Sequence, residues 1–362
     1  MALAIQYVDN MRVDYGNRLA WWQVQVSELC ASHDANTTLG RMIGAQHHDK
    51  WLSAKQSVTT PPAPALMSFE SVCAIGDVHA DMALLLYILE ESGHIECIMI
   101  NEVMTLWWSN PCHAVIICGD LLDGVRSRVA AAHDNDHEEI YLLQLIDRFP
   151  NLLCVIGNHE YMRVVLGDET YCGRNNDCSW KRTNGGPNVP LGMHLAERFP
   201  MIIHVRLGMM DCLFMHTMSD NLSGNDGHIA RYKRSNSVPY ITGMNRKAHA
   251  AMCTGLRDGL VEDALWGREI IMKPPDTRGI NELLVGCGCN KDQSVVCIGH
   301  TMQAVTDEKI CVTQNLGRCS SAVLPCDVQM SKAFILDGSK ERNILYTMLT
   351  EGSVRRMYVT LK

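Results

Sequence analysis

The sequence predicts an α/β fold in which a largely parallel sheet is followed by a second, more mixed sheet. Between about residue 68 and residue 156, three short apolar runs alternate with segments of helical periodicity, and each run ends at a glycine. Alternation of this kind is typical of βαβ units. After residue 202 the apolar runs have few helices between them, which indicates a second sheet.

The elements of the first half are expected in a regular order. Apolar residues recur at helical spacing in Met82–Glu91 and in Glu138–Phe149, so both segments are expected to be helices. The three apolar runs that precede glycines are expected to be strands: Ser71–Ile75, Ala114–Cys118 and Leu152–Ile156.

The second half is expected to be mostly strands and loops. Residues 170–188 and 219–245 are rich in Asn, Gly, Ser, Arg and Asp, which predicts long surface loops of the kind that cover substrate sites. The expected strands are Ile202–Arg206, Cys212–Met215, Val295–Ile298, Ile310–Val312, Ala333–Leu336 and Ile344–Thr347.

The chain is expected to divide into three parts. Residues 1–60 form an N-terminal extension without recognisable chemistry. Its tryptophans Trp21, Trp22 and Trp51 indicate that it packs onto another surface, for which a protein partner is one candidate. Residues 61–67 form a linker, because prolines fix φ and remove hydrogen-bond donors. Residues 68–362 form the domain that carries the chemistry.

Composition narrows the class of protein. The chain has 362 residues, of which 47% are hydrophobic and 20% charged, as in ordinary soluble globular proteins. A net charge of −8 argues against broad nucleic-acid binding. None of the 16 cysteines forms a CxxC pair, which favours reduced thiols and a cytoplasmic protein. The sequence shows no signal peptide or membrane span, so no membrane association is expected.

Five short strings carry the candidate chemistry: GDVHA (76–80), GDLLDG (119–124), GNHE (157–160), MHT (215–217) and GHT (299–301). They contribute six oxygen or imidazole ligands: Asp77, His79, Asp120, Asn158, His216 and His300. The order of the five strings is informative, because each string alone is a common turn.

The position of these residues predicts a metal site. Asp77, Asp120 and Asn158 each follow an apolar run and a glycine, which places them at the carboxyl edge of a parallel sheet, where ligands bind. Oxygen and imidazole ligands without thiolate suit two divalent transition-metal ions (Mn, Fe or Zn). Two such ions clamp a phosphate and generate hydroxide at neutral pH. By contrast, the isolated histidines His204, His228 and His249 are interpreted as structural residues.

GDVHA, GDLLDG, GNHE and GHT resemble the motifs of the calcineurin-like metallophosphoesterase superfamily. The single GHT, LWGRE (Leu265–Glu269) and DVQMS (Asp327–Ser331) are similar to the phosphoprotein phosphatase branch, and GNHEYMRVVLGDETY resembles its bacterial, Shewanella-like phosphatases. The resemblance extends from about Ser71 to Ser331. It implies a β-sandwich of two mixed sheets flanked by helices.

The resemblance also implies roles for individual residues. Asp120 would bridge the two metals, and a bridging hydroxide would attack phosphorus. His159 would protonate the leaving oxygen, with Asp123 as its orienting carboxylate. The remaining ligands would be divided between the ions, with Asp77 and His79 on the first and Asn158, His216 and His300 on the second.

The chain departs from the family pattern at three places. Ala80 replaces a glycine, and the segment after His216 reads HTMSD without a glycine pair. Gly124 stands where the family has a phosphate-binding arginine, so Arg126 and Arg268 become the candidates for that role. Arg268 is the better candidate because LWGRE keeps the family register.

Three functions remain open on the sequence alone. The first is a protein Ser/Thr phosphatase acting on a phosphorylated protein. An alternative is hydrolysis of a dinucleoside polyphosphate or an RNA cap by the same chemistry. The third is a weakly active or non-catalytic binding protein that retains the metal site.

Overall fold

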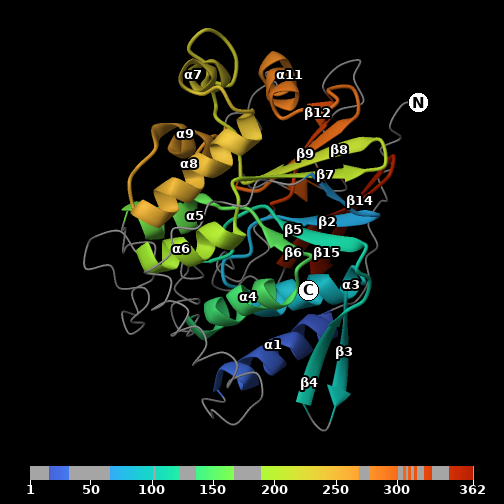
Figure 1. Cartoon of the computed structure of the whole chain (residues 1–362). Helices are drawn as coiled ribbons and strands as arrows, with labels where there is room; N and C mark the ends of the chain where they lie inside the picture. The colour runs from blue at the N-terminus through green and yellow to red at the C-terminus, as the bar shows by residue number, and fades with distance from the viewer. Residues whose placement is uncertain are drawn as a thin grey trace.

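Two mixed sheets face each other and helices cover their outer faces (Figure 1). This confirms the fold class that the sequence predicts. The computed structural model describes residues 16–31, 66–100, 103–122, 136–166, 189–268, 277–300, 305–306, 309–310, 314–315, 322–327 and 342–361.

The first sheet has the strand order β15-β14-β2-β5-β6. Its strands β2, β5 and β6 are parallel, as predicted, but β14 pairs antiparallel with β2 and with β15. The strand bounds are β2 (Ser71–Ile75), β5 (His113–Ile117), β6 (Leu152–Cys154), β14 (Arg342–Thr350) and β15 (Ser353–Leu361).

The second sheet has the strand order β1-β7-β8-β9-β13-β12 and combines parallel with antiparallel pairs. Its strand bounds are β1 (Met67–Ser68), β7 (Ile202–Leu207), β8 (Met210–Met215), β9 (Ser294–Ile298), β12 (Gln314–Asn315) and β13 (Ala322–Pro325). Two further antiparallel pairs stand apart, β3 (Ile95–Ile100) with β4 (Val103–Trp108) and β10 (Val305–Thr306) with β11 (Lys309–Ile310).

Side chains on the two faces of the strands form two separate buried clusters. Side chains of β2 and β5 at alternate positions, such as Val72 and Ile116, join Phe214 and Val295 of the second sheet in one buried cluster between the sheets. The intervening residues, such as Cys73, belong to a larger cluster with the helices. Both faces of each central strand are therefore buried, which explains their continuous apolar runs.

The helices occupy the outside of the sandwich (Figure 1). Asp81 begins α3 by accepting a hydrogen bond from the backbone N of Leu84. The helix bounds are α1 (Gly16–Ala31), α3 (Met82–Glu91), α4 (Asp136–Arg148), α5 (Asn158–Tyr161), α6 (Val189–Arg198), α7 (His228–Ser235), α8 (Tyr240–Thr254), α9 (Gly259–Leu265) and α11 (Thr277–Gly286), and a π-helical turn η3 (Met162–Leu166) follows α5.

Several predictions of the elements need correction. Segment 344–347 lies in the first sheet rather than the second, because β14 pairs with β2. Residues 219–245 are not one loop, since they hold α7 and the start of α8. Residues 309–310 pair only with β10 within the described part of the chain. The β3–β4 hairpin was not predicted. The expected strand 333–336 and loop 170–188 lie outside the described residues.

The tryptophans of the N-terminal segment pack as expected where they are described. In α1, Trp22 is fully buried and donates from Nε1 to Glu90 Oε2 of α3 at 2.8 Å, and Arg18 pairs with the same carboxylate. Trp51 lies outside the described residues. The division into extension, linker and domain stays a prediction.

Candidate metal centre

The candidate ligands lie just beyond the carboxyl ends of strands from both sheets. Asp77 follows β2 and Asp120 follows β5, whereas His216 follows β8 and His300 follows β9. Asn158 begins α5, shortly after β6. These five residues, together with His79 and His159, are each at most 5% exposed. One buried rim of the sandwich therefore brings together residues far apart in the sequence.

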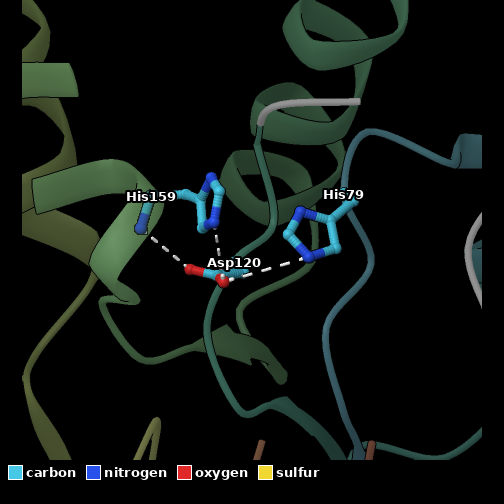
Figure 2. A group of neighbouring side chains, drawn as sticks. All are labelled: His79, Asp120 and His159. Carbon is cyan, nitrogen blue, oxygen red and sulfur yellow. Dashed lines mark hydrogen bonds and ion pairs between the residues drawn. The ribbon is translucent and has the colours of Figure 1, made fainter. Parts of the chain in front are cut away.

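The first group of side chains surrounds one oxygen of Asp120 (Figure 2). His79 Nε2 lies 3.9 Å from Asp120 Oδ2 and 3.8 Å from Asp77 Oδ2. His159 Nε2 lies 3.7 Å from Asp120 Oδ2, and its backbone N donates to Asp120 Oδ1 at 3.0 Å. Spacings near 4 Å between donor atoms leave room for an ion to bind between them.

The second group surrounds the other oxygen of the same carboxylate. His216 Nε2 lies 3.5 Å from Asp120 Oδ1, 2.8 Å from Asn158 Oδ1 and 3.0 Å from His300 Nδ1. Asp120, His216 and His300 offer ligand atoms close enough together to hold one ion. Asp120 is thus common to both groups.

The backbone at this rim is strained. Among the described residues, all non-glycine positions with positive φ lie here: His79 (46°), Ala80 (57°), Asp120 (48°) and His300 (60°). The left-handed region costs an L-residue roughly 1–2 kcal/mol. Ala80 stands where the family has a glycine, and a glycine would adopt this positive φ without strain. The added methyl group is fully buried.

Glu160, to which the sequence analysis assigns no role, holds the backbone of two turns at this rim. Its Oε2 accepts from the backbone N of Asp120 at 3.1 Å and of Gly157 at 2.9 Å, and its Oε1 accepts from Leu122 N at 2.9 Å. One buried carboxylate therefore joins the turn of GDLLDG to the turn of GNHE. Burial and the charge of Asp120 raise the pKa of Glu160 to about 7. The position of Glu160 within the GNHE string was the feature of the sequence that could have indicated this role.

Further contacts orient the candidate ligands. His216 Nδ1 lies 2.8 Å from the carbonyl oxygen of Cys118, which leaves Nε2 directed at the other ligands. The backbone N of His300 donates to Asp77 Oδ1 at 3.0 Å. The first contact orients the His216 ring, and the second holds the backbone of His300 beside Asp77.

The electrostatics fit cation binding. Burial and the neighbouring His216 lower the pKa of His300 to about 2, so its ring is neutral and its lone pair is available. Its Nε2 is buried and has no hydrogen-bond partner among the described residues. Burial alone would raise the pKa of Asp120, but the surrounding imidazoles, His159 first, hold it well below its usual value. A carboxylate surrounded by imidazoles is a suitable donor set for transition metals.

Of the two candidate arginines, only Arg268 is described. Its side chain is exposed. Burial is the main cause that lowers the pKa values of His216 and His300, and the positive charge of Arg268 contributes to both shifts. The charge of the guanidinium therefore acts on the second group. Asp123, Gly124 and Arg126 lie outside the described residues, so their roles stay predictions.

The three histidines interpreted as structural have local partners. His228 Nδ1 lies 2.9 Å from Asp263 Oδ2, and His249 is near Cys253. His204 lies with Asp211 and Cys289 in a third group of possible ligands. There, however, the Asp211 carboxylate already pairs with Arg206 at 2.9 Å, which makes the group an ion-pair network.

Among the helices that the structure describes, none has the length and apolar character needed to cross a membrane.

The match to a protein family agrees with the geometry. Residues 71–245 match the family model of the calcineurin-like phosphoesterases. Among solved structures, the chain is similar to a protein serine/threonine phosphatase from Saccharomyces cerevisiae with similarity to human phosphatase PP5. The identity is 14%, the match covers 93% of this chain and 96% of that chain, and the TM-score is 0.48. No curated protein matches the chain.

The matched segment contains four of the five motif strings and ends before GHT. The fold then adds His300 from β9 to the residues that this segment supplies. On the family match, residues 71–245 of this chain form a calcineurin-like phosphoesterase domain.

Proposed function

We propose that this protein hydrolyses phosphomonoesters with two divalent metal ions, and that it acts as a protein Ser/Thr phosphatase. The observation that carries the proposal is the Asp120 carboxylate, whose two oxygens face two separate groups of ligands. A carboxylate placed in this way can serve two ions at once.

The ligand sets follow from the two groups. Asp77 and His79 would hold one ion with Asp120, while the second ion would be held by Asn158, His216 and His300 with the same carboxylate. The approach of His300 Nδ1 to His216 Nε2 and the neutral state of the His300 ring support this assignment. When bound, two such ions supply an activated water and offset the charge of the phosphoryl oxygens.

His159 is proposed as the general acid. Its ring lies edge-on to that of His79, with centroids 5.0 Å apart, and its backbone N is fixed by the Asp120 carboxylate. These contacts hold the imidazole at the border of the first group, where it can donate a proton to a leaving oxygen. Because His159 also counts among the possible ligands of this group, metal content distinguishes the two roles.

Arg268 is proposed to hold the phosphate of the substrate, with Arg126 as the other candidate. The guanidinium carries a fork of donors that suits two phosphoryl oxygens. Removal of such a group raises KM and lowers kcat together. Arg268→Ala should therefore cost more in kcat/KM than Arg126→Ala. Changes below about threefold in both variants, well under 1 kcal/mol, would show that the arginines do not hold phosphate.

The substrate class is tested by a panel. Manganese-loaded protein is given a phosphoserine peptide, diadenosine tetraphosphate and a capped RNA, and kcat/KM is measured for each. The proposal expects the phosphopeptide to be the best substrate. A higher kcat/KM for diadenosine tetraphosphate or capped RNA would show that the protein is a nucleotide hydrolase of the same chemistry. No turnover of any of the three substrates would indicate a binding protein.

A further inference from the structure

We infer that Thr217 and Asp220 are positioning residues that hold the backbone of Gly267 and Arg268, and that they thereby set Arg268 against the substrate phosphate. This inference rests on the proposed function, since it concerns how the phosphate-binding arginine is held. It assigns a role to the HTMSD segment, the part of the chain that departs from the family's glycine pair.

Two hydrogen bonds join the segment to LWGRE. Thr217 Oγ1 donates to the carbonyl oxygen of Gly267 at 2.5 Å. The backbone N of Arg268 donates to Asp220 Oδ1 at 2.6 Å. The two bonds fix both sides of the peptide group between Gly267 and Arg268. The second bond has a carboxylate acceptor, which makes it stronger than a neutral bond.

Close packing adds to these bonds. A Cβ atom at Gly267 would overlap the carbonyl oxygen of Met218, so the two segments touch backbone to backbone. Only glycine permits this approach. Thr217 is itself buried, which shields its hydrogen bond from competing water.

A third contact anchors the segment to the element that precedes Arg268. Ser219 Oγ donates to Asp263 Oδ2 of α9 at 2.8 Å. The same carboxylate pairs with Arg231 and lies 2.9 Å from His228 Nδ1. The loop after His216 is therefore fixed to α9 and to the residues that follow α9.

The consequence is a direct link between a ligand and the arginine. His216 immediately precedes Thr217 in the chain, and Gly267 immediately precedes Arg268. Because the Arg268 side chain is exposed, its reach toward the phosphate depends on where its backbone is held. A glycine at position 217 would lack the hydroxyl group that makes this bond, so the departure from the family pattern supplies a fixing contact for the arginine.

The test compares Asp220→Ala with Asp220→Asn in the full-length, manganese-loaded protein. Asp220→Ala should lower kcat/KM for p-nitrophenyl phosphate by about tenfold, the effect of one lost hydrogen bond. KM should rise and kcat should fall, with metal content unchanged. Asp220→Asn keeps an acceptor oxygen and should recover activity to within about threefold. Asp226→Ala removes a carboxylate that is 91% exposed and serves as the matched control.

The Arg268→Ala background shows whether Asp220 acts through the arginine. There, Asp220→Ala should cause no further loss, because the arginine that it positions is gone. Thr217→Val removes the other hydrogen bond and should repeat the kinetic effect of Asp220→Ala. Thr217→Val also serves as a second test of the inference if the melting temperature of Asp220→Ala is well below that of Asp226→Ala.

Binding of inorganic phosphate, followed by calorimetry, gives a readout without turnover and should weaken in Asp220→Ala. If the wild type hydrolyses the ester and Asp220→Ala matches Asp226→Ala, the positioning role is wrong while the proposed function stands. A full additional loss in the Arg268→Ala background also overturns it. If the loaded wild type neither hydrolyses the ester nor binds phosphate, both proposals fail.

Discussion

Asp120 combines an unusual backbone conformation, complete burial and a shifted pKa. Its backbone is left-handed, its side chain is 1% exposed, and its pKa lies well below the usual value. Asp tolerates left-handed φ better than most residues, which lowers the strain. Strained residues persist where surrounding contacts over-determine them, and here Glu160 accepts a hydrogen bond from the Asp120 backbone N. The strain is therefore part of how the carboxylate faces both groups.

His159 provides the residue-scale prediction. His159→Asn should reduce kcat for an alkyl phosphate by roughly 10²–10⁴-fold, because general acid–base catalysis contributes this much. The loss should be much smaller for p-nitrophenyl phosphate, whose leaving group needs little protonation. Metal content, measured by mass spectrometry, should stay at the wild-type level. Equal losses on both esters would reject the role of proton donor, and loss of an ion would identify His159 as a ligand.

At this scale the sequence locates the polar side chains but not their surroundings. Asp77, Asn158 and His300 stand out because each occurs in a short string with a strand or glycine before it. The positive φ of Ala80 and His300 could not be predicted, since it depends on long-range packing. The contact of Asp220 with Arg268 spans 48 positions, and no local pattern indicates it.

At the scale of elements, the turn of GNHE depends on Glu160. Glu160→Gln should reduce the free energy of unfolding by about 1–3 kcal/mol, because an amide offers one acceptor oxygen and leaves a buried backbone N–H unpaired. The comparison is made by urea denaturation at pH 8, above the pKa of about 7, where the carboxylate is ionised. A variant as stable as the wild type would show that these hydrogen bonds do not hold the two turns together.

The junction of α3 and β3 gives a pH-dependent prediction. Burial and the charge of His113 lower the pKa of His94 to about 4, below its ordinary 6.5. Since the unfolded state takes up the proton first, stability that is present above pH 6.5 is lost as the pH falls toward 4.

The variant His94→Gln removes this titration. Its free energy of unfolding should fall less steeply between pH 6.5 and pH 4 than that of the wild type, by at most about 3 kcal/mol over the range. Urea denaturation at several pH values measures both slopes. Parallel curves for the two proteins would contradict the assignment.

Strands that end at a glycine were predicted well, because buried parallel strands have continuous apolar runs. The partners of each strand were harder to predict. The apolar residues of β14 would be buried in either sheet, so its sequence does not indicate which sheet it joins. Helix α7 escaped prediction because only His228, Ile229 and Tyr232 are buried in it, within a polar segment that has the composition of a loop.

For the whole molecule, the sandwich explains why the site is distributed over the sequence. Asp77 and Asp120 come from the first sheet, and His216 and His300 come from the second. The cluster of apolar residues between the sheets sets their separation, and so sets the distance between the ligands. The site therefore depends on the packing of two layers rather than on any one loop.

The central claim, that one carboxylate serves two metal ions in phosphate ester hydrolysis, is tested most directly by a metal titration. Metal-free protein is titrated with Mn²⁺ in a calorimeter, and hydrolysis of p-nitrophenyl phosphate is followed in parallel. Activity should rise with binding and level off at about two ions per chain. Asp120→Asn should lose most of both the metal and the activity. Full metal content and full activity in Asp120→Asn would contradict the account, as would a metal-loaded wild type without hydrolysis.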